Sequence, residues 1–288
     1  YITRVYRRTW WTTKRCWSSK RHIIVFGETW LLISIDDINV QKILDLASSI
    51  EKHGPTQTYP HKILANLFYE PSTRTSASFA SAMYRLGGNV ISINDVNYSS
   101  VAKGENLADT IVTMANYADI IALRSKNKGD AKIASEVSSV PIINAGDGNG
   151  EHPTQTLLDL YTIHKKFGRI EDLVVTFVGD IENGRTVHSL DKALVNSTKH
   201  FIPTYDKNIW PESDVYYLTR VQRERGSESS YSMKKEHIHH IPENAIVMHP
   251  FPRNEEIPTW FDKDPRAKYF EQMKNGLYVR MAILSYFL

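Results

Sequence analysis

The stretch Phe68-Tyr69-Glu70-Pro71-Ser72-Thr73-Arg74-Thr75-Ser76 stands where an apolar segment gives way to a helical pattern. Residues 63–69 are apolar enough for a buried strand. Hydrophobic side chains then recur at the spacing of one helical face until the glycine pair at 87–88, which is typical of a helix end. Ser72 belongs to the residue types preferred at helix N-caps. The sequence therefore predicts a strand, a short loop and a helix that begins near Ser72.

This arrangement is suited to binding phosphate. The free N–H groups and the positive end of the helix dipole would face a ligand above Ser72. The guanidinium of Arg74 can donate two parallel hydrogen bonds to phosphate oxygens, and the hydroxyls of Thr73 and Thr75 add further donors. An ordinary N-cap followed by a surface arginine is the alternative, and the motif by itself fits both.

The rest of the chain alternates between strand and helix patterns. We expect a first helix opened by Asp36-Asp37 and ended near residue 54, strands at 63–69, 90–93, 120–123 and 142–144, and a helix at 154–164. The pattern then restarts with strands at 173–178, 215–218 and 245–248 and a helix that carries Val187, Leu190 and Leu194. Such alternation predicts an α/β fold of two parallel-sheet domains, each sheet covered on both faces.

We place the domain boundaries at composition changes and at the restart of the pattern. A basic extension, 1–32, precedes domains at 33–165 and 166–274, and the apolar segment 275–288 is expected to be a terminal helix. Residues 1–31 hold seven Lys or Arg against one acid, so the chain's net charge of +3 belongs to this end. Three interpretations fit the extension: an organelle transit peptide, an RNA-binding arm with stacking tryptophans, or a segment foreign to the native protein.

Composition also excludes several classes of protein. The single cysteine, Cys16, excludes an internal disulfide framework and a thiolate zinc cluster. No apolar run reaches the roughly 18 residues that a membrane span needs. Because the body of the chain is not basic, we expect neither nucleic acid nor a membrane as partner. We expect a cytoplasmic protein, or a plastid or other organelle protein if the extension is a transit peptide.

Polar side chains follow the expected strands. They are residues 72–75 after the first strand, Arg124 after 120–123, His152 after 142–144, Arg185 after 173–178, Arg220 after 215–218, and His249-Pro250 after 245–248. In open parallel sheets, ligands bind at the carboxyl ends of the strands. The spacing therefore predicts one site in the cleft between the two domains.

Six further motifs occur in a fixed order along the chain. They are Lys103-Gly104-Glu105, Leu123-Arg124, Gly150-Glu151-His152-Pro153-Thr154-Gln155, Gly184-Arg185-Thr186, Thr219-Arg220-Val221-Gln222-Arg223-Glu224-Arg225 and Met248-His249-Pro250-Phe251-Pro252-Arg253. With the opening motif, they resemble the catalytic chains of the aspartate transcarbamoylase family, from about residue 33 to the end. The resemblance implies transfer of the carbamoyl group of carbamoyl phosphate to L-aspartate, in pyrimidine synthesis and without a cofactor.

The resemblance also implies roles for individual residues. Carbamoyl phosphate would be held by Ser72, Thr73, Arg74, Thr75, Arg124, His152, Gln155, the backbone carbonyls of Pro250 and Phe251, and Ser99 and Lys103 from a neighbouring subunit of a homotrimer. Thr75, Arg124 and His152 would polarise the carbamoyl carbonyl, and Lys103 and Arg74 would join them in catalysis. L-Aspartate would be bound by Lys103, Arg185, Arg220 and Gln222. Glu70 would pair across the domains with Arg185 and Arg225 as the cleft closes.

Two departures from the family keep other functions open. Residues 191–213 and 225–249 are shorter than the family pattern, which shortens the aspartate-binding domain, and residues 25–32 interrupt an otherwise family-like passage. The alternatives are a catalytically weak homologue and a transcarbamoylase for another amine such as ornithine. The ornithine relatives carry a cysteine where His249-Pro250 stands, and this chain has no cysteine after Cys16. The sequence identifies neither a regulatory subunit nor a fusion partner.

Two other motifs suggest cofactors but lack the required context. The histidines at 237, 239 and 240 have no carboxylate or cysteine partner at ligand spacing, so we predict a polar loop rather than a metal site. Residues 178–184 lack the glycine spacing of a dinucleotide fingerprint. We therefore expect neither a metal nor NAD.

Overall fold

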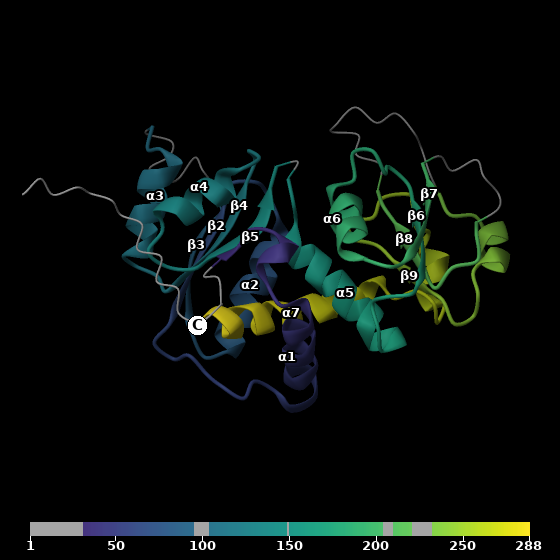
Figure 1. Cartoon of the computed structure of the whole chain (residues 1–288), viewed down its shortest axis with the longest axis horizontal. Helices are drawn as coiled ribbons and strands as arrows, with labels where there is room; N and C mark the ends of the chain where they lie inside the picture. Colours follow the sequence, from purple (N-terminus) through teal and green to yellow (C-terminus); the bar gives the residue numbers. More distant parts are fainter. Residues whose placement is uncertain (1–30, 95–103, 149, 204–209, 221–231) are drawn as a thin grey trace, which may run out of the picture.

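The computed structural model describes residues 31–94, 104–148, 150–203, 210–220 and 232–288. Two parallel sheets lie side by side, with helices between and around them (Figure 1). The first sheet has the spatial order β1 (Leu31–Leu32), β5 (Ile142–Asp147), β4 (Ile120–Ser125), β2 (Ile63–Phe68) and β3 (Asn89–Ile93). The predicted strands of this half are confirmed, and the expected α/β class with two parallel-sheet domains is correct.

Helices cover both faces of the first sheet. One face carries α1 (Val40–His53), α2 (Thr73–Arg85), α5 (Pro153–Phe167) and α7 (Tyr269–Phe287), and the other carries α3 (Leu107–Ala115) and α4 (Asp130–Val137). Strand β2 shows why both faces are needed. Leu64 and Phe68 belong to the core under the first set of helices, whereas Ala65 and Leu67 belong to the core under the second. Successive side chains of a strand point to opposite faces, so an apolar strand of this kind must be covered twice.

The second sheet has the order β7 (Thr198–Ile202), β6 (Val174–Val178), β8 (Val215–Leu218) and β9 (Ile246–Met248). Helix α6 (Arg185–Ala193) contributes Val187 and Leu190 to a core that continues into the first domain. The opposite face packs against irregular segments and two 3₁₀ helices, η5 (Lys235–His240) and η6 (Thr259–Lys263).

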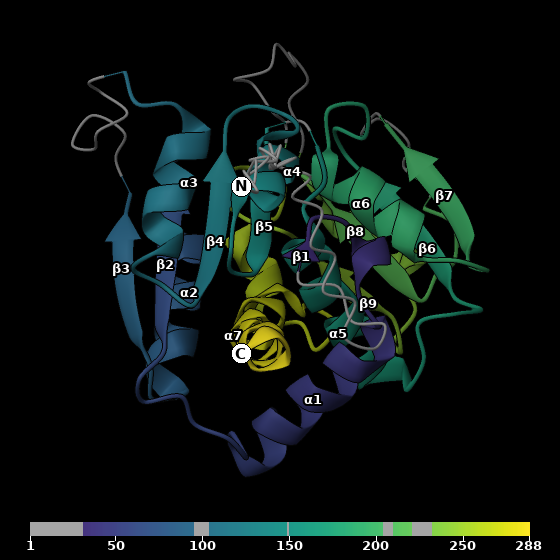
Figure 2. The ribbon, with the colours of Figure 1, turned by 60° about the vertical axis from the view of Figure 1, so that its left-hand side comes forward.

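Helices α5 and α7 join the two halves. α7 packs against α1, α2 and α5, so the last helix of the chain lies beneath the first sheet (Figure 2). The main hydrophobic cluster includes Leu157 and Leu160 of α5 together with Val215 and Met248 of the second sheet. The two domains thus share buried apolar surface, which stabilises their contact.

Several sequence predictions need correction. Asp36 and Asp37 belong to a 3₁₀ helix, η1 (Ile35–Asp37), and α1 begins three residues later with Asn39 as its N-cap. The carboxylate of Asp37 accepts hydrogen bonds from the backbone N–H groups of Ile33 and Ser34, at 2.9 and 2.7 Å, which favours a separate turn. Leu31 and Leu32 pair with β5, although we assigned them to the basic extension.

Strand β7 and helix α4 were also not predicted. β7 is an edge strand with the polar sequence Thr-Lys-His at its start, so it lacks the apolar run of a central strand. α4 is short, and its buried contacts are made by Ala131 and Ala134, which give a weak periodic signal. Within the described ranges, no helix has both the length and the apolar character needed to cross a membrane.

Candidate active site

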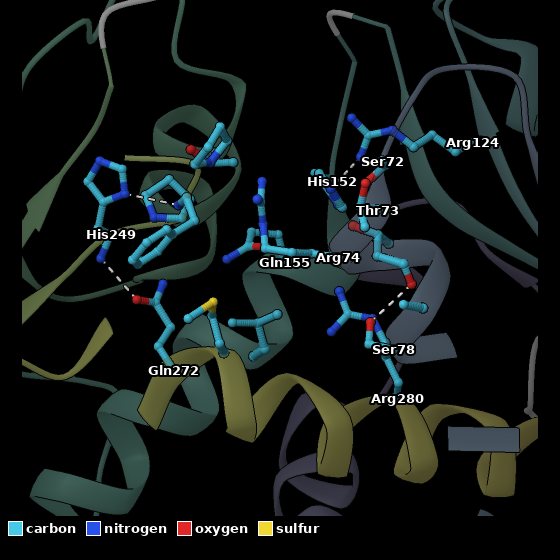
Figure 3. Close-up of a pocket in the computed structure, with 18 of the residues that line it drawn as sticks. Ser72, Thr73, Arg74, Ser78, Arg124, His152, Gln155, His249, Gln272 and Arg280 are labelled. Carbon is cyan, nitrogen blue, oxygen red and sulfur yellow. Dashed lines mark hydrogen bonds between the residues drawn. The ribbon is translucent and has the colours of Figure 1, made fainter. Parts of the chain in front are cut away.

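A cavity of about 880 Å³ lies between the carboxyl ends of the two sheets, with α7 as its floor (Figure 3). It brings together twelve of the residues predicted from sequence: Glu70, Ser72, Thr73, Arg74, Thr75, Arg124, His152, Gln155, Arg185, Arg220, Pro250 and Phe251. The other four, Ser99, Lys103, Gln222 and Arg225, lie outside the described residues. The prediction that polar residues after successive strands share one cleft is confirmed for the described set.

The amino-terminal end of α2 forms one wall. Ser72 occupies the N-cap position, as expected, but its hydroxyl makes no capping hydrogen bond. The first turn is instead tied to the sheet, because the buried amide of Asn66 donates to the carbonyl and hydroxyl oxygens of Ser76, at 3.2 and 3.0 Å. The helix therefore starts at a fixed place on β2 while the Ser72 side chain stays available to a ligand.

Glu70 links the two domains through arginines. Its Oε2 accepts a hydrogen bond of 3.0 Å from Arg124 Nε and forms an ion pair of 2.9 Å with Arg124 Nη2. The same oxygen lies 3.4 Å from Arg185 Nη2. The expected pairing of Glu70 with Arg185 is present, and Arg124 is an additional partner that the sequence did not suggest. Arg185 also donates to the carbonyl of Gly148 in the first domain. Because Arg185 opens α6 of the second domain, these contacts hold the two walls of the cavity together.

His152 is buried at the start of α5 and is neutral. Burial, followed by repulsion from Arg124 and Arg185, holds the pKa of this imidazole well below its ordinary value. Its Nε2 lies 3.4 Å from Arg124 Nη1 and its Nδ1 lies 3.5 Å from Thr154 Oγ1. A guanidinium can only donate, so Nε2 is the acceptor of the first contact.

The second domain contributes Arg220, which follows β8, and the loop that follows β9. In that loop, His249 Nδ1 accepts a hydrogen bond of 2.9 Å from the backbone N–H of Phe251. Burial, then repulsion from Arg253 and Arg220, lowers the pKa of His249 to about 3. His249 is therefore a neutral support for the loop.

The floor contains polar residues that sequence reasoning missed. Gln272 and Arg280 are buried on α7 and line the cavity. Burial lowers the pKa of Arg280 to about 10, against the opposing attraction of Asp159. Arg280 Nη1 donates to the carbonyl of Gly276 within the same helix, at 2.9 Å. Arg280 stands in an apolar run and Gln272 in a mixed polar and apolar one, and neither belongs to a motif, so the sequence did not mark them as site residues.

Cations dominate the cavity. Its lining includes five arginines and Lys274 against one acid, Glu70. The arginines also repel one another: burial, followed by the charge of Arg220, lowers the pKa of Arg74. A cavity with this excess of fixed positive charge attracts ligands that carry several negative charges.

The histidines at 237–240 form part of η5 rather than a polar loop. His237 is buried and stacks on Trp210, with 4.6 Å between the ring centroids, and its Nδ1 accepts from the backbone N–H of Lys234. In the part of the chain that the structure describes, no three His, Cys, Asp or Glu side chains are grouped as metal ligands.

Comparison with known proteins places these features in a family. The sequence model described as "Aspartate/ornithine carbamoyltransferase, carbamoyl-P binding domain" matches residues 31–165, and that of the "Asp/Orn binding domain" matches residues 214–287. The chain is 42% identical over 293 residues to an aspartate carbamoyltransferase catalytic subunit of Thermoplasma acidophilum, covering 88% of this chain and 96% of the relative. It is 44% identical over 296 residues to that of Methanocaldococcus jannaschii, with the same coverage.

Solved structures agree with the sequence relatives. The catalytic subunit of M. jannaschii aspartate transcarbamoylase has a TM-score of 0.81 at 43% identity, covering 90% of this chain and 98% of that one. Aspartate transcarbamoylase from Trypanosoma cruzi, in complex with N-(phosphonacetyl)-L-aspartic acid, has a TM-score of 0.80 at 35% identity, covering 90% and 94%. By sequence and by structure, the chain belongs to the aspartate/ornithine carbamoyltransferase family.

Proposed function

We propose that the chain transfers the carbamoyl group of carbamoyl phosphate to the amine of L-aspartate, giving N-carbamoyl-L-aspartate and phosphate for pyrimidine synthesis. One observation carries the proposal. The cavity joins the helix terminus at Ser72, with Arg74, Arg124 and His152, to Arg185 and Arg220 from the opposite domain. The first group suits a dianionic phosphate with an adjacent carbonyl, and the second suits the two carboxylates of aspartate.

The phosphate is held by the first turn of α2. Free backbone N–H groups, the hydroxyls of Ser72, Thr73 and Thr75 and the guanidinium of Arg74 surround it in this proposal. Because Ser72 makes no capping bond within the protein, its hydroxyl can turn to the phosphate. The backbone N–H groups of this turn are held in place by the helix before the ligand arrives, so little reorganisation of the backbone opposes binding.

The carbamoyl carbonyl is polarised by Thr75, Arg124 and His152. Amine attack makes its oxygen an oxyanion, and removing one donor to such an oxygen costs about 10²–10³ in rate. In the structure, Arg124 Nη1 faces His152 Nε2. We propose that the bound carbonyl replaces this contact and that the neutral imidazole then carries its proton on Nε2 instead of Nδ1, so that the Nε2–H donates to the carbonyl oxygen. Gln155 and the backbone carbonyls of Pro250 and Phe251 accept hydrogen bonds from the carbamoyl NH₂.

Aspartate is bound by Arg185, Arg220 and Gln222. Its α-amine attacks the carbamoyl carbon, the bond to phosphate breaks, and the departing phosphate accepts the amine proton. Catalysis then rests on positioning and electrostatics. Glu70 tethers Arg185 to the first domain, and Arg225 is proposed as a second partner of Glu70 on closure.

We further propose a homotrimer in which Ser99 and Lys103 of one subunit complete the site of the next, through one repeated heterologous contact. We assign the first domain to residues 31–165 and the second to residues 166–268, with the terminal helix α7 returning to the first domain. The alignment with the Thermoplasma relative is 293 residues long, whereas this chain contributes 88% of its 288 residues to it. About 40 residues of the relative are therefore without a counterpart in this chain. We assign this difference to a shortened second domain.

A transfer assay tests the function. Purified protein is given carbamoyl phosphate with either L-aspartate or L-ornithine, and the carbamoylated product is measured. We expect carbamoyl aspartate only, because the side-chain ammonium of ornithine would face Arg185 and Arg220. Arg74→Ala should lose activity, whereas Arg85→Ala, at the exposed far end of the same helix, should keep it. Product from ornithine, or equal activity of the two variants, would contradict the proposal.

A further inference from the structure

A buried carboxylate lies beneath the cavity. Asp159 is in the middle of α5, is fully buried, and accepts three hydrogen bonds. Its Oδ1 accepts from Gln155 Nε2 at 2.9 Å and from Gln272 Nε2 at 2.6 Å, and its Oδ2 accepts from the hydroxyl of Tyr217 at 2.8 Å. These partners come from α5, α7 and β8, so Asp159 joins both domains at one point.

The carboxylate determines how the two amides are oriented. An ionised carboxylate only accepts hydrogen bonds, so each glutamine must turn its NH₂ toward Asp159 and its oxygen away. The orientation of Gln272 agrees independently, because its Oε1 accepts from the backbone N–H of His249 at 2.9 Å. If Asp159 is protonated on Oδ2, Oδ1 remains an acceptor and the orientation persists.

Both glutamines donate to Asp159 and also line the cavity. Because the Nε2 of Gln155 donates to Asp159, the amide oxygen is the atom that Gln155 presents to a ligand. Gln272 holds His249, whose Nδ1 in turn holds the N–H of Phe251. That second connection fixes the loop whose carbonyls, at Pro250 and Phe251, also line the cavity. All of these groups present hydrogen-bond acceptors.

We propose that Asp159 is a positioning residue that makes the site selective for an acyl phosphate bearing an NH₂ group. By fixing both amides, it keeps acceptors pointed at the place where the carbamoyl NH₂ donates, and an acyl phosphate with a methyl group leaves them unpaired. Buried acceptors without a donor are costly, so such a site discriminates strongly between the two. The inference rests on the proposed carbamoyl transfer.

The test compares two donor substrates of nearly the same shape. Acetyl phosphate replaces the NH₂ of carbamoyl phosphate with a methyl group. Asp159→Asn gives the glutamines an amide in place of the carboxylate, so their orientations are no longer imposed. We expect kcat/KM for carbamoyl phosphate to fall about 10- to 100-fold. Because acetyl phosphate uses no NH₂ donor, its kcat/KM should change much less, and the preference for carbamoyl phosphate should shrink by the difference.

Tyr217→Phe is the matched control. It removes one hydrogen bond from Oδ2 of the same carboxylate but leaves both amides on Oδ1, so the preference should stay at the wild-type value. Gln272→Met provides a second variant should Asp159→Asn fail to fold. It removes both hydrogen bonds of Gln272, to Asp159 and to His249, but leaves Gln155 on Oδ1, and it should lower the preference part of the way. Equal losses for both donors, or an unchanged preference in these variants, would show a purely structural role. If the wild-type protein transfers neither group, the proposed function itself is wrong.

Discussion

The buried site residues predict an unusual response of stability to acid. His152 and His249 are neutral in the folded chain, with the pKa of His249 at about 3 and that of His152 well below normal. In the unfolded chain, both have a pKa of about 6.5. As pH falls below that value, the unfolded chain takes up protons that the folded chain does not, so the free energy of unfolding decreases. From pH 7.5 to 5.5, this costs about 1.3 kcal/mol per histidine.

The titration of Asp159 changes the free energy of unfolding in the opposite direction. Burial raises the pKa of this carboxyl to about 7, against its three hydrogen bonds. Because its unfolded pKa is about 3.9, the folded chain binds this proton first, and stability rises by about 2 kcal/mol between pH 7.5 and 5.5. The wild-type protein should therefore lose only about 1 kcal/mol. Asp159→Asn removes the compensation and should lose about 3 kcal/mol, whereas His249→Asn should gain roughly half a kcal/mol.

Urea unfolding at the two pH values measures these differences. Intrinsic fluorescence reports the transition, and a single protein concentration keeps any assembly constant. His249→Asn retains an oxygen that can accept from the backbone N–H of Phe251, which limits its other effects. Each variant is compared with itself at the two pH values, so constant losses from repacking cancel. If wild type and Asp159→Asn respond to pH in parallel, Asp159 does not titrate in this range and the reasoning is wrong.

Three further predictions concern the site. Arg220→Ala should abolish turnover while leaving carbamoyl phosphate affinity within about threefold by calorimetry, whereas Arg74→Ala should weaken that affinity directly; equal losses in both would refute the assignment. Treatment with a chelator should leave activity unchanged, because arginines, histidine and N–H groups carry all charge stabilisation; activity lost in chelator and restored by zinc or magnesium would contradict this. Lys103→Ala and Arg220→Ala should each be inactive alone but regain activity when dissociated and reassembled together, whereas mixed assemblies without recovery would show that Lys103 does not complete a neighbouring site.

The fold could be predicted where burial leaves a periodic signal. Central strands such as β2 and β4 are apolar throughout because both of their faces are covered. β7 has only one neighbour among the described strands and begins with polar residues, so nothing distinguished it from a loop. The start of α1 was placed too early because Asp36 has the right residue type for a cap, whereas the hydrogen bonds made by Asp37 decide the turn.

The candidate site divides in the same way. Residues that follow strands could be predicted, since parallel strands bring their carboxyl ends to one edge. Asp159, Gln272 and Arg280 could not, because they lie inside helices and belong to no motif, and because Asp159 meets Tyr217 and Gln272 from distant parts of the sequence. Gln272 lies 113 positions from Asp159, and no local pattern encodes that contact. The hydrogen bonds beneath the cavity therefore depend on how α5 and α7 pack against each other.

The same packing bears on whether a shortened second domain can still work. β7 ends at Ile202 and β8 starts at Val215, and the residues between them barely reach the dozen that a parallel crossover needs. β7 is at the edge of the sheet, however, whereas Arg185, Arg220 and the loop from His249 follow β6, β8 and β9. Those three strands are adjacent, and β6 and β8 share a core with α5. Because the short connection leads from the edge strand, we expect it to lower stability more than catalysis, which favours an active enzyme over a weak homologue.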